Sequence, residues 1–229
     1  MQQEHILRTN TATTGSVLET NKVLRNTYML LSMTLLVSAA AAGIAMTVNL
    51  GRGPALMMML AAIGLIWFVL PKTANSSKGI YVVFAFTALM GAALGPTLNH
   101  YLAMTNGSSL VMQALGGTAL VFFSLSGYVL TTRKDFSFMG GFLMTGLVVI
   151  VLIAVALMAG SLFGIHIPAA HLALSAGIVL LMSGFILFDT SRIIHGGETN
   201  YLMATVSLYL NIYNLFTSLL HLLGVMSDD

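Results

Sequence analysis

Seven long apolar segments follow one another along the chain, separated by short polar connections. They run approximately over residues 28–48, 54–70, 79–98, 108–130, 140–162, 169–193 and 204–225. A bilayer core about 30 Å thick is crossed by roughly 20 apolar residues in a helix, and each segment is close to that length. Lipid offers no hydrogen-bond partner to exposed backbone, so the crossing segments must be α-helices. The sequence therefore predicts an all-α, polytopic membrane protein with seven transmembrane helices.

The composition agrees with lipid as the main solvent of the folded chain. Hydrophobic residues make up 57% of the chain and charged residues only 7%, whereas a water-facing domain carries about a quarter of charged residues. The formal net charge of +2 gives no indication of nucleic-acid binding. Cysteine is absent, which excludes disulfide bonds, thiolate metal sites and cysteine nucleophiles.

The first 27 residues are polar and lack the apolar core of a secretory signal. We therefore expect a flexible cytoplasmic tail over 1–27, a transmembrane domain over 28–226 and a short outer tail over 227–229. The positive-inside rule gives the orientation. The other side of the membrane receives only Arg52, while the side of the N-terminus receives eight basic residues, which are Arg8, Lys22, Arg25, Lys72, Lys78, Arg133, Lys134 and Arg192. The N-terminus is thus predicted to be cytoplasmic and the C-terminus to lie outside.

Asp189 is the one acidic residue well inside a predicted span, toward the cytoplasmic end of the sixth segment. Placing an aspartate at mid-bilayer costs about 2.5 to 3.5 kcal/mol on insertion scales, so such a residue indicates a function. A local alternative stays open, in which Asp189 reaches the membrane interface and pairs with Arg192, three residues further on.

The seventh segment carries a polar stripe with spacings of four, three, four and three residues, formed by Ser207, Asn211, Asn214, Ser218 and His221. Residues at these spacings share one helix face, which should point into the bundle. The stripe predicts either hydrogen bonds that hold helices together or a hydrated path beside Asp189. In the sixth segment, Met182 and Phe185 lie in an apolar stretch between polar ends, which is typical of a closed gate.

Signatures of enzymes and metal sites are weak. Ser126 lies in a Ser-Leu-Ser-Gly run that partly resembles the serine motif of intramembrane rhomboid proteases, but Ser124 replaces the first glycine of that motif. An intramembrane aspartyl protease needs two aspartates, and Asp189 stands alone. Calcium prefers about six to eight oxygen ligands, including several carboxylates. We therefore expect no catalytic residue, no metal site and no cofactor.

Three motifs in the predicted spans belong together. Residues 91–98 read Gly-Ala-Ala-Leu-Gly-Pro-Thr-Leu, residues 114–122 read Ala-Leu-Gly-Gly-Thr-Ala-Leu-Val-Phe, and residues 188–196 read Phe-Asp-Thr-Ser-Arg-Ile-Ile-His-Gly. Together they resemble the signature of the Bax inhibitor family, and the likeness extends over nearly the whole chain. The resemblance implies six helices around a central one. The small residues also predict close helix packing, and Gly95-Pro96 is expected to kink or stop the third helix.

Within the family, the stretches 22–28, 128–135 and 195–201 resemble bacterial inner-membrane members that modulate the FtsH protease. This resemblance implies a multi-pass protein of the bacterial inner membrane that is not an enzyme. Its implied function is to bind FtsH and its associated membrane complex and to inhibit proteolysis. Its implied partners are the lipid bilayer and this protease, with no nucleic acid.

The alternative function that the family implies is a pH-sensitive leak channel for calcium or other cations. Family members of that kind carry a pair of aspartates, of which Asp189 matches the first, whereas Asn211 occupies the position of the second. One acid and one amide cannot share a proton as two acids do. The candidates for an ion pathway or for pH sensing, with calcium or protons as the ions, are Asp189, Asn211, Arg192, Asn214 and Ser207, with Met182 and Phe185 as gate candidates.

Overall fold

The computed structural model describes residues 2–165 and 167–227, and side-chain contacts are described from Thr20 onward. This part of the chain is helical and contains no strand. In chain order the elements are α1 (Gln2–Thr47), α2 (Arg52–Gly64), the π-helical turn η1 (Leu65–Val69), α3 (Leu70–Thr73), α4 (Lys78–Leu102), α5 (Gly107–Thr132), the short 3-10 turn η2 (Ser137–Met139), α6 (Gly140–Leu162), α7 (Pro168–Ile194) and α8 (Tyr201–Ser227).

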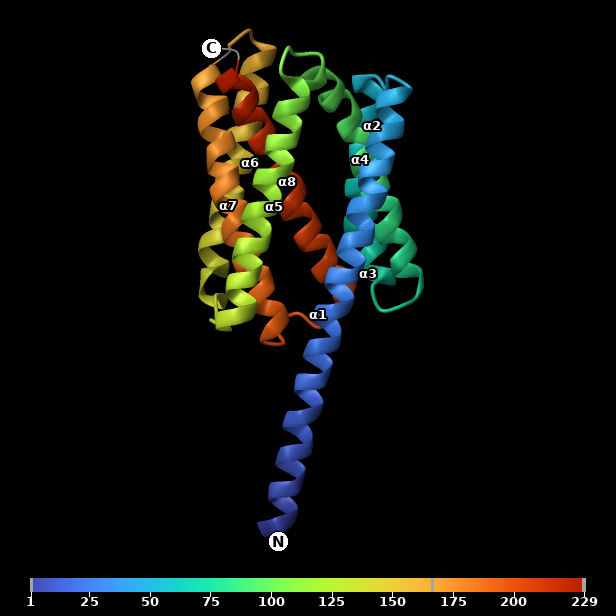
Figure 1. Cartoon of the computed structure of the whole chain (residues 1–229), viewed down its shortest axis with the longest axis vertical. Helices are drawn as coiled ribbons and strands as arrows, with labels where there is room; N and C mark the ends of the chain where they lie inside the picture. Colours follow the sequence, from blue (N-terminus) through green and yellow to red (C-terminus); the bar gives the residue numbers. More distant parts are fainter. Residues whose placement is uncertain (1, 166, 228–229) are drawn as a thin grey trace.

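Seven of these helical stretches are long and apolar enough to cross a membrane, which confirms the predicted fold class. They are Thr20–Thr47, Arg52–Thr73, Lys78–Leu102, Gly107–Thr132, Ser137–Leu162, Pro168–Ile194 and Tyr201–Ser227. The N- and C-termini lie at opposite ends of the bundle, as an odd number of crossings requires (Figure 1). Which end faces the cytoplasm stays a prediction, and the ends are called here the N-terminal end and the C-terminal end.

The structure draws the predicted tail and the first span as one element. Helix α1 runs from Gln2 to Thr47 without a break at residue 28, the predicted start of the span. The flexibility of 1–27 stays a prediction. At the other terminus Ser227 is the last residue of α8, and residues 228–229 of the predicted outer tail lie outside the described residues.

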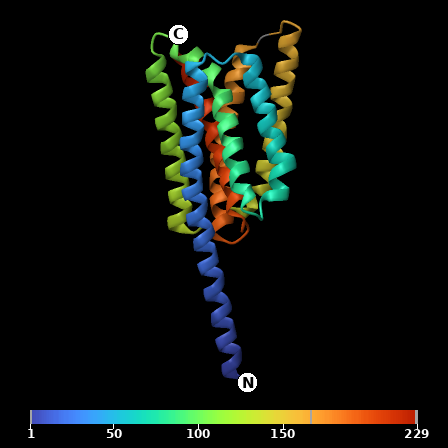
Figure 2. The same cartoon turned by 90° about the vertical axis from the view of Figure 1, so that its right-hand side faces the viewer.

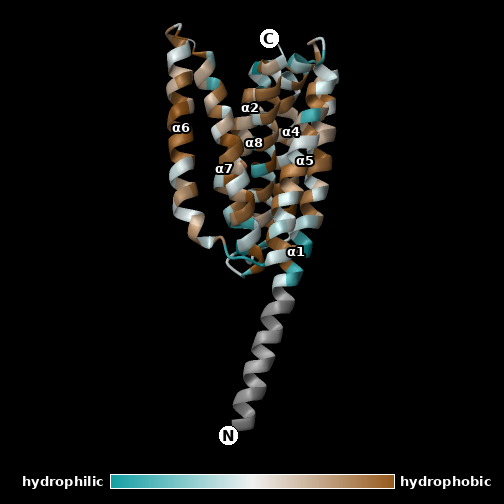
Figure 3. Ribbon diagram, turned by 60° about the vertical axis from the view of Figure 1, so that its left-hand side comes forward, coloured by the Kyte–Doolittle hydropathy of each residue, from teal (hydrophilic) through white to brown (hydrophobic). Residues whose placement is uncertain are grey.

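Helix α8 occupies the centre of the bundle (Figure 2). Half of the residues in its most apolar stretch are buried, against 6% in the corresponding stretch of α6. Helix α6 is apolar all round, and its ribbon is coloured brown to white in Figure 3. Helix α8 packs directly against α1, α4, α5 and α7, whereas α2 packs mainly on α4 and α6 on α7. The arrangement of six helices around one is therefore realised as four helices in direct contact and two outside them. The central helix is also the one that carries the polar stripe, because lipid would leave these groups without partners.

Helices α1 and α4 approach each other most closely, and glycines make this approach possible. A Cβ atom added to Gly91 would collide with the backbone of Ser38, and one added to Gly95 would collide with Ala45. The predicted close packing of this motif is confirmed. Of the two effects expected of Pro96, the stop is wrong, because α4 continues to Leu102, and the kink stays a prediction. The packing of the preceding turns against α1 holds the helix together across the missing backbone donor.

The second crossing is interrupted by a π-helical turn at Leu65–Val69, which ends two residues before Pro71. Proline has no backbone N–H and its ring crowds the carbonyl four residues earlier. A wider turn relieves this crowding while the helix goes on, which is a common use of a π-bulge.

The loop before α8 is tied to the loop after α3 by Asn200. Its Oδ1 caps α8 by accepting hydrogen bonds from the backbone N–H of Leu202 at 2.9 Å and of Met203 at 3.3 Å. Its Nδ2 donates to the Ala74 carbonyl at 2.9 Å and to Asn75 Oδ1 at 3.0 Å. One side chain thus both caps the central helix and connects it to the loop after α3 at the N-terminal end.

Candidate functional site

The structure brings Asp189 of α7 and Asn211 of α8 into direct contact. Asn211 Nδ2 donates a hydrogen bond of 2.8 Å to Asp189 Oδ2. Both residues are buried, with exposed fractions of 8% and 6%. They lie on the facing sides of two antiparallel helices. There the Asn211 amide supplies a hydrogen bond that water would give to an exposed carboxyl group. A hydrogen bond of this kind removes most of the cost of burying the polar group.

Arg192 forms its ion pair with Glu198 and not with Asp189, which is its partner in the local alternative. Its guanidinium lies 3.6 Å from Glu198 Oε2, the only ion pair in the described part of the chain, and donates to the Gly197 carbonyl at 3.1 Å. It also lies over the Phe188 ring, 5.5 Å from the centroid. Arg192 therefore closes the turn after α7, while Asp189 turns inward to α8.

A second polar contact joins α7 and α8 near the C-terminal end. Ser175 Oγ lies 2.9 Å from His221 Nδ1, and Ser175 is buried. The two hydrogen-bonded pairs lie four turns apart along α7. Between them along α7, Met182 is buried and Phe185 half-buried, and their role as a gate stays a prediction.

The other members of the predicted stripe do not join the Asp189 site. Asn214 Nδ2 donates to the Leu210 carbonyl of its own helix at 2.9 Å. Ser207 is half-buried, and Ser218 is buried. Asn211 and His221 thus link the stripe to α7, and the choice between a packing surface and a hydrated path stays a prediction.

Next to Asp189, α7 is also linked to α5. Thr190 Oγ1 and Ser126 Oγ lie 3.3 Å apart, and both residues are buried. Ser126, the residue of the protease-like run, thus has a hydroxyl partner on a neighbouring helix.

Sequence reasoning missed a set of contacts that hold the loop between α5 and η2 against the end of α7. Ser191 Oγ accepts a hydrogen bond of 2.8 Å from the backbone N–H of Phe136 and lies 3.3 Å from Asp135 Oδ1. His195 places Nδ1 2.9 Å from the Ser191 carbonyl and Nε2 3.1 Å from the Arg133 carbonyl. The His195 ring therefore lies between the last turn of α7 and the loop after α5.

Neighbouring groups shift the pKa values of two charged side chains in the same loop. Hydrogen bonds from the Ser137 hydroxyl and backbone N–H hold the pKa of Asp135 below its usual value, and the backbone bond measures 2.8 Å. Interaction with the Tyr128 hydroxyl raises the pKa of Lys134, whose Nζ lies 5.6 Å from the centre of that ring. The loop therefore keeps opposite charges side by side at the N-terminal end.

The chemistry open to the Asp189 site is limited by its small number of ligands. It offers one carboxyl group and one amide, and within the described residues no three His, Asp or Glu side chains converge. The site can hold or release a proton or exchange hydrogen bonds when the helices move. It lacks the several carboxylates of a calcium cage.

Comparison with known proteins defines the family. The model of the family described as inhibitor of apoptosis-promoting Bax1 matches residues 20–228, nearly the whole chain. The chain belongs to the Bax inhibitor family. The match covers all seven apolar helices, so the shared feature of this Bax inhibitor family member is the complete bundle.

Several bacterial relatives are similar along almost their full length. A Vibrio cholerae protein described as an uncharacterized membrane protein is 54% identical over 96% of this chain and 97% of its own. An Escherichia coli protein described as modulator of FtsH protease YccA is 54% identical over 93% of this chain and 94% of its own. An uncharacterized protein of Pseudomonas aeruginosa is 48% identical over 92% of both chains.

Proposed function

We propose that this protein binds the membrane protease FtsH, with its associated membrane complex, and restrains its proteolysis in the bacterial inner membrane. The observation that carries the proposal is the similarity to the Escherichia coli modulator of FtsH, which extends over the whole bundle and both chains. The names of the family and of this relative describe regulatory membrane proteins and not enzymes.

The proposed mechanism uses the N-terminal segment 1–27 as a handle on the cytoplasmic side. The excess of eight basic residues over one supports this orientation. Helix α1 leads without interruption from this segment into the bundle, where it packs along α4 and α8. A protease that pulls on the handle must therefore draw α1 out of its glycine-lined contact with α4. The protein would occupy FtsH as a slowly extracted substrate.

The test combines a shortened chain with a chain of normal length. Deletion of residues 2–19 should abolish recovery of FtsH in a gentle-detergent affinity purification and restore the turnover of other FtsH membrane substrates in a pulse-chase experiment. Replacement of the same residues by a Gly/Ser segment of equal length separates the need for a handle from the need for its sequence. Unchanged FtsH association and unchanged substrate turnover in the deletion variant would contradict the mechanism.

A second candidate function is a pH-sensitive leak pathway for protons or calcium, and it rests on the buried Asp189–Asn211 hydrogen bond. A carboxyl group inside a membrane bundle is a place where an ion pathway can be gated. Asn211 replaces the second acid of leak-forming relatives, so we expect the parent protein to conduct weakly. Movement of α7 against α8 would have to break this bond before Met182 and Phe185 could separate.

Reconstitution into ion-loaded vesicles tests this candidate. The comparison includes the parent, Asp189→Asn and Asn211→Asp, with protein-free vesicles as the reference. Faster leak only in Asn211→Asp would show a pathway that the amide keeps closed. If all three proteins leak no faster than empty vesicles, the channel function is wrong while the proposal for FtsH is untouched.

A further inference from the structure

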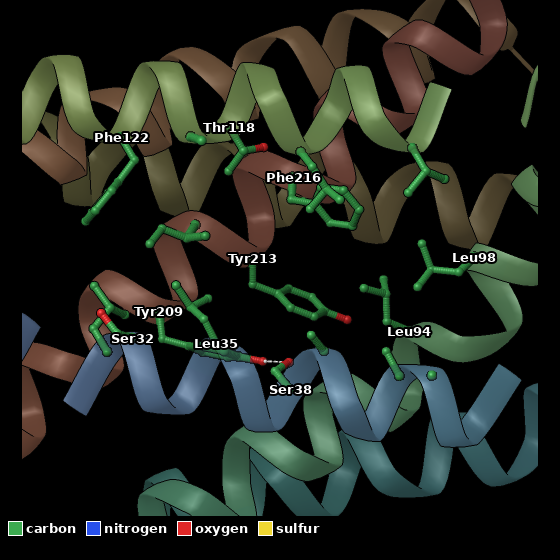
Figure 4. A pocket seen from close by; sticks show the side chains of 18 of the residues that line it. Ser32, Leu35, Ser38, Leu94, Leu98, Thr118, Phe122, Tyr209, Tyr213 and Phe216 are labelled. Atoms are coloured by element: carbon green, nitrogen blue, oxygen red, sulfur yellow. Dashed lines mark hydrogen bonds between the residues drawn. The ribbon is translucent and has the colours of Figure 1, made fainter. Parts of the chain in front are cut away.

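A half-open cavity of about 460 Å³ lies between α1 and α5, with α8 as its floor. It forms a groove along the side of the bundle where the α1 and α5 backbones stay apart, and the rings of Tyr28 and Phe122 meet across it with 6.1 Å between their centroids. Its lining is largely apolar and includes Ala39 and Gly43 of α1, Phe122 of α5 and Phe216 of α8. Figure 4 shows the ring of Tyr213 reaching into this space from α8.

The size of the groove decides what it can hold. Its lining on α1 runs from Tyr28 to Met46, which is about 27 Å at a rise of about 1.5 Å per residue. An extended hydrocarbon chain can lie along an apolar groove of this length, and it brings no polar group that the lining would have to satisfy.

The charge at the N-terminal mouth of the groove indicates the head group. Arg25 lies one turn before Tyr28 and is exposed. It is seven residues before Ser32, which places it on the helix face that lines the groove. A guanidinium at this position matches the phosphate of a lipid whose chain enters the groove beside it.

We propose that the groove is a binding site for one acyl chain of an anionic phospholipid, with the lipid phosphate at Arg25. The chain would cover the apolar side chains between α1 and α5 and seal the side of α8 that no protein helix covers. The hydrogen bond of 2.7 Å between Ser38 and Tyr209 forms the wall beneath it, so bound lipid and the packing of α1 on α8 would support each other.

The test is photo-labelling of the full chain in vesicles of phosphatidylethanolamine and phosphatidylglycerol. The probe is phosphatidylglycerol with a diazirine on one acyl chain, and labelled residues are located by mass spectrometry. We expect adducts to concentrate on the groove residues of α1, α5 and α8. Similar labelling per residue on the outer face of α6, for example at Leu152, would overturn the proposal.

Gly43 and Gly116 give a matched pair of variants, because the space around both is equally open. A side chain at Gly43, in the groove, and one at Gly116, outside the lining, would both enter open space. Gly43→Leu should reduce groove labelling about tenfold, because it displaces about two methylenes of the bound chain. Gly116→Leu should leave it unchanged. Equal labelling in both variants would sink the proposal.

Arg25→Gln tests the head group. Labelling by the phosphatidylglycerol probe should fall, while labelling by a phosphatidylcholine probe with the same diazirine chain should stay the same. If both probes lose labelling equally, or neither does, the assignment of an anionic lipid is wrong.

Discussion

Toward α7, helix α8 presents amide and imidazole groups that are hydrogen-bonded across the interface, whereas toward α1 and α5 it presents aromatic rings that border an open groove. Asn211 and His221 belong to the first side, and Tyr213 and Phe216 to the second. Helices in lipid gain little from burying apolar surface against one another. Polar pairs therefore mark the contact that must persist, and an apolar side can be left to lipid.

The largest expected effect comes from forcing α1 away from α4. Gly91→Ala should destabilise the bundle by about 3 kcal/mol, because its new Cβ atom collides with the backbone of Ser38 and neither helix can yield without moving. Unfolding of the detergent-solubilised protein by increasing SDS measures the loss. Gly116→Ala is the control with open space, and its stability should be equal to or slightly above that of the parent. Equal stability of the two variants would mean that α1 is free to shift.

Asn211→Leu tests the polar side and should cost about 2 kcal/mol, because the buried Asp189 carboxyl group loses its donor on α8. The same unfolding assay applies. Asn214→Leu is the matched control, since the Asn214 amide donates to the Leu210 carbonyl of its own helix, and the loss of stability should be clearly smaller. If both variants lose the same stability, the contact between Asp189 and Asn211 does not hold α7 to α8.

Ser175→Ala removes the hydroxyl partner of His221 at the C-terminal end and should cost about 1 kcal/mol. Ser183→Ala serves as the control in α7, because the Ser183 hydroxyl bonds to the Val179 carbonyl of the same helix. Hydrogen exchange of the α7 backbone should increase around residue 175 in the first variant only. An equal increase in both would show that the cross-link has no role of its own.

The smallest effect is expected on the groove side. Tyr213→Phe should change stability by less than about 0.5 kcal/mol, because the structure gives the Tyr213 hydroxyl no hydrogen-bond partner among the described residues. Tyr209→Phe should cost about 1 kcal/mol, because it removes the bond to Ser38. The difference between two tyrosines one turn apart is the measurement, and a larger loss for Tyr213→Phe would contradict the hydrogen bonding described for the two hydroxyls.

The number and type of the helices could be predicted from the sequence because the bilayer imposes both the length and the apolar character of each span. The contact between Asp189 and Asn211 was within reach, since each residue falls on the polar face of its helix and the two helices run in opposite directions. Pairing of Asp189 with Arg192 was the open local alternative, and it fails because the turn after α7 supplies Glu198.

The groove and the loop contacts could not be predicted from the chain alone. Ala39 and Gly43 have the same appearance in a sequence whether they face a helix, lipid or an empty slot, because the distance between α1 and α5 is set by other helices. Ser191 and His195 lie at the end of a span, where polar residues commonly meet water. Their partners come from a loop more than fifty residues earlier in the chain.

The hydrogen bonds of Asn200 have a mechanical consequence for the N-terminal end of the bundle. Through this side chain the start of α8 is bonded to the loop after α3. The Glu198 carboxylate accepts a hydrogen bond of 2.9 Å from the Asn200 backbone N–H and pairs with Arg192 at the end of α7. A load applied at the N-terminal end is therefore shared among three crossings. The bundle would have to yield as a unit there, and not one helix after another.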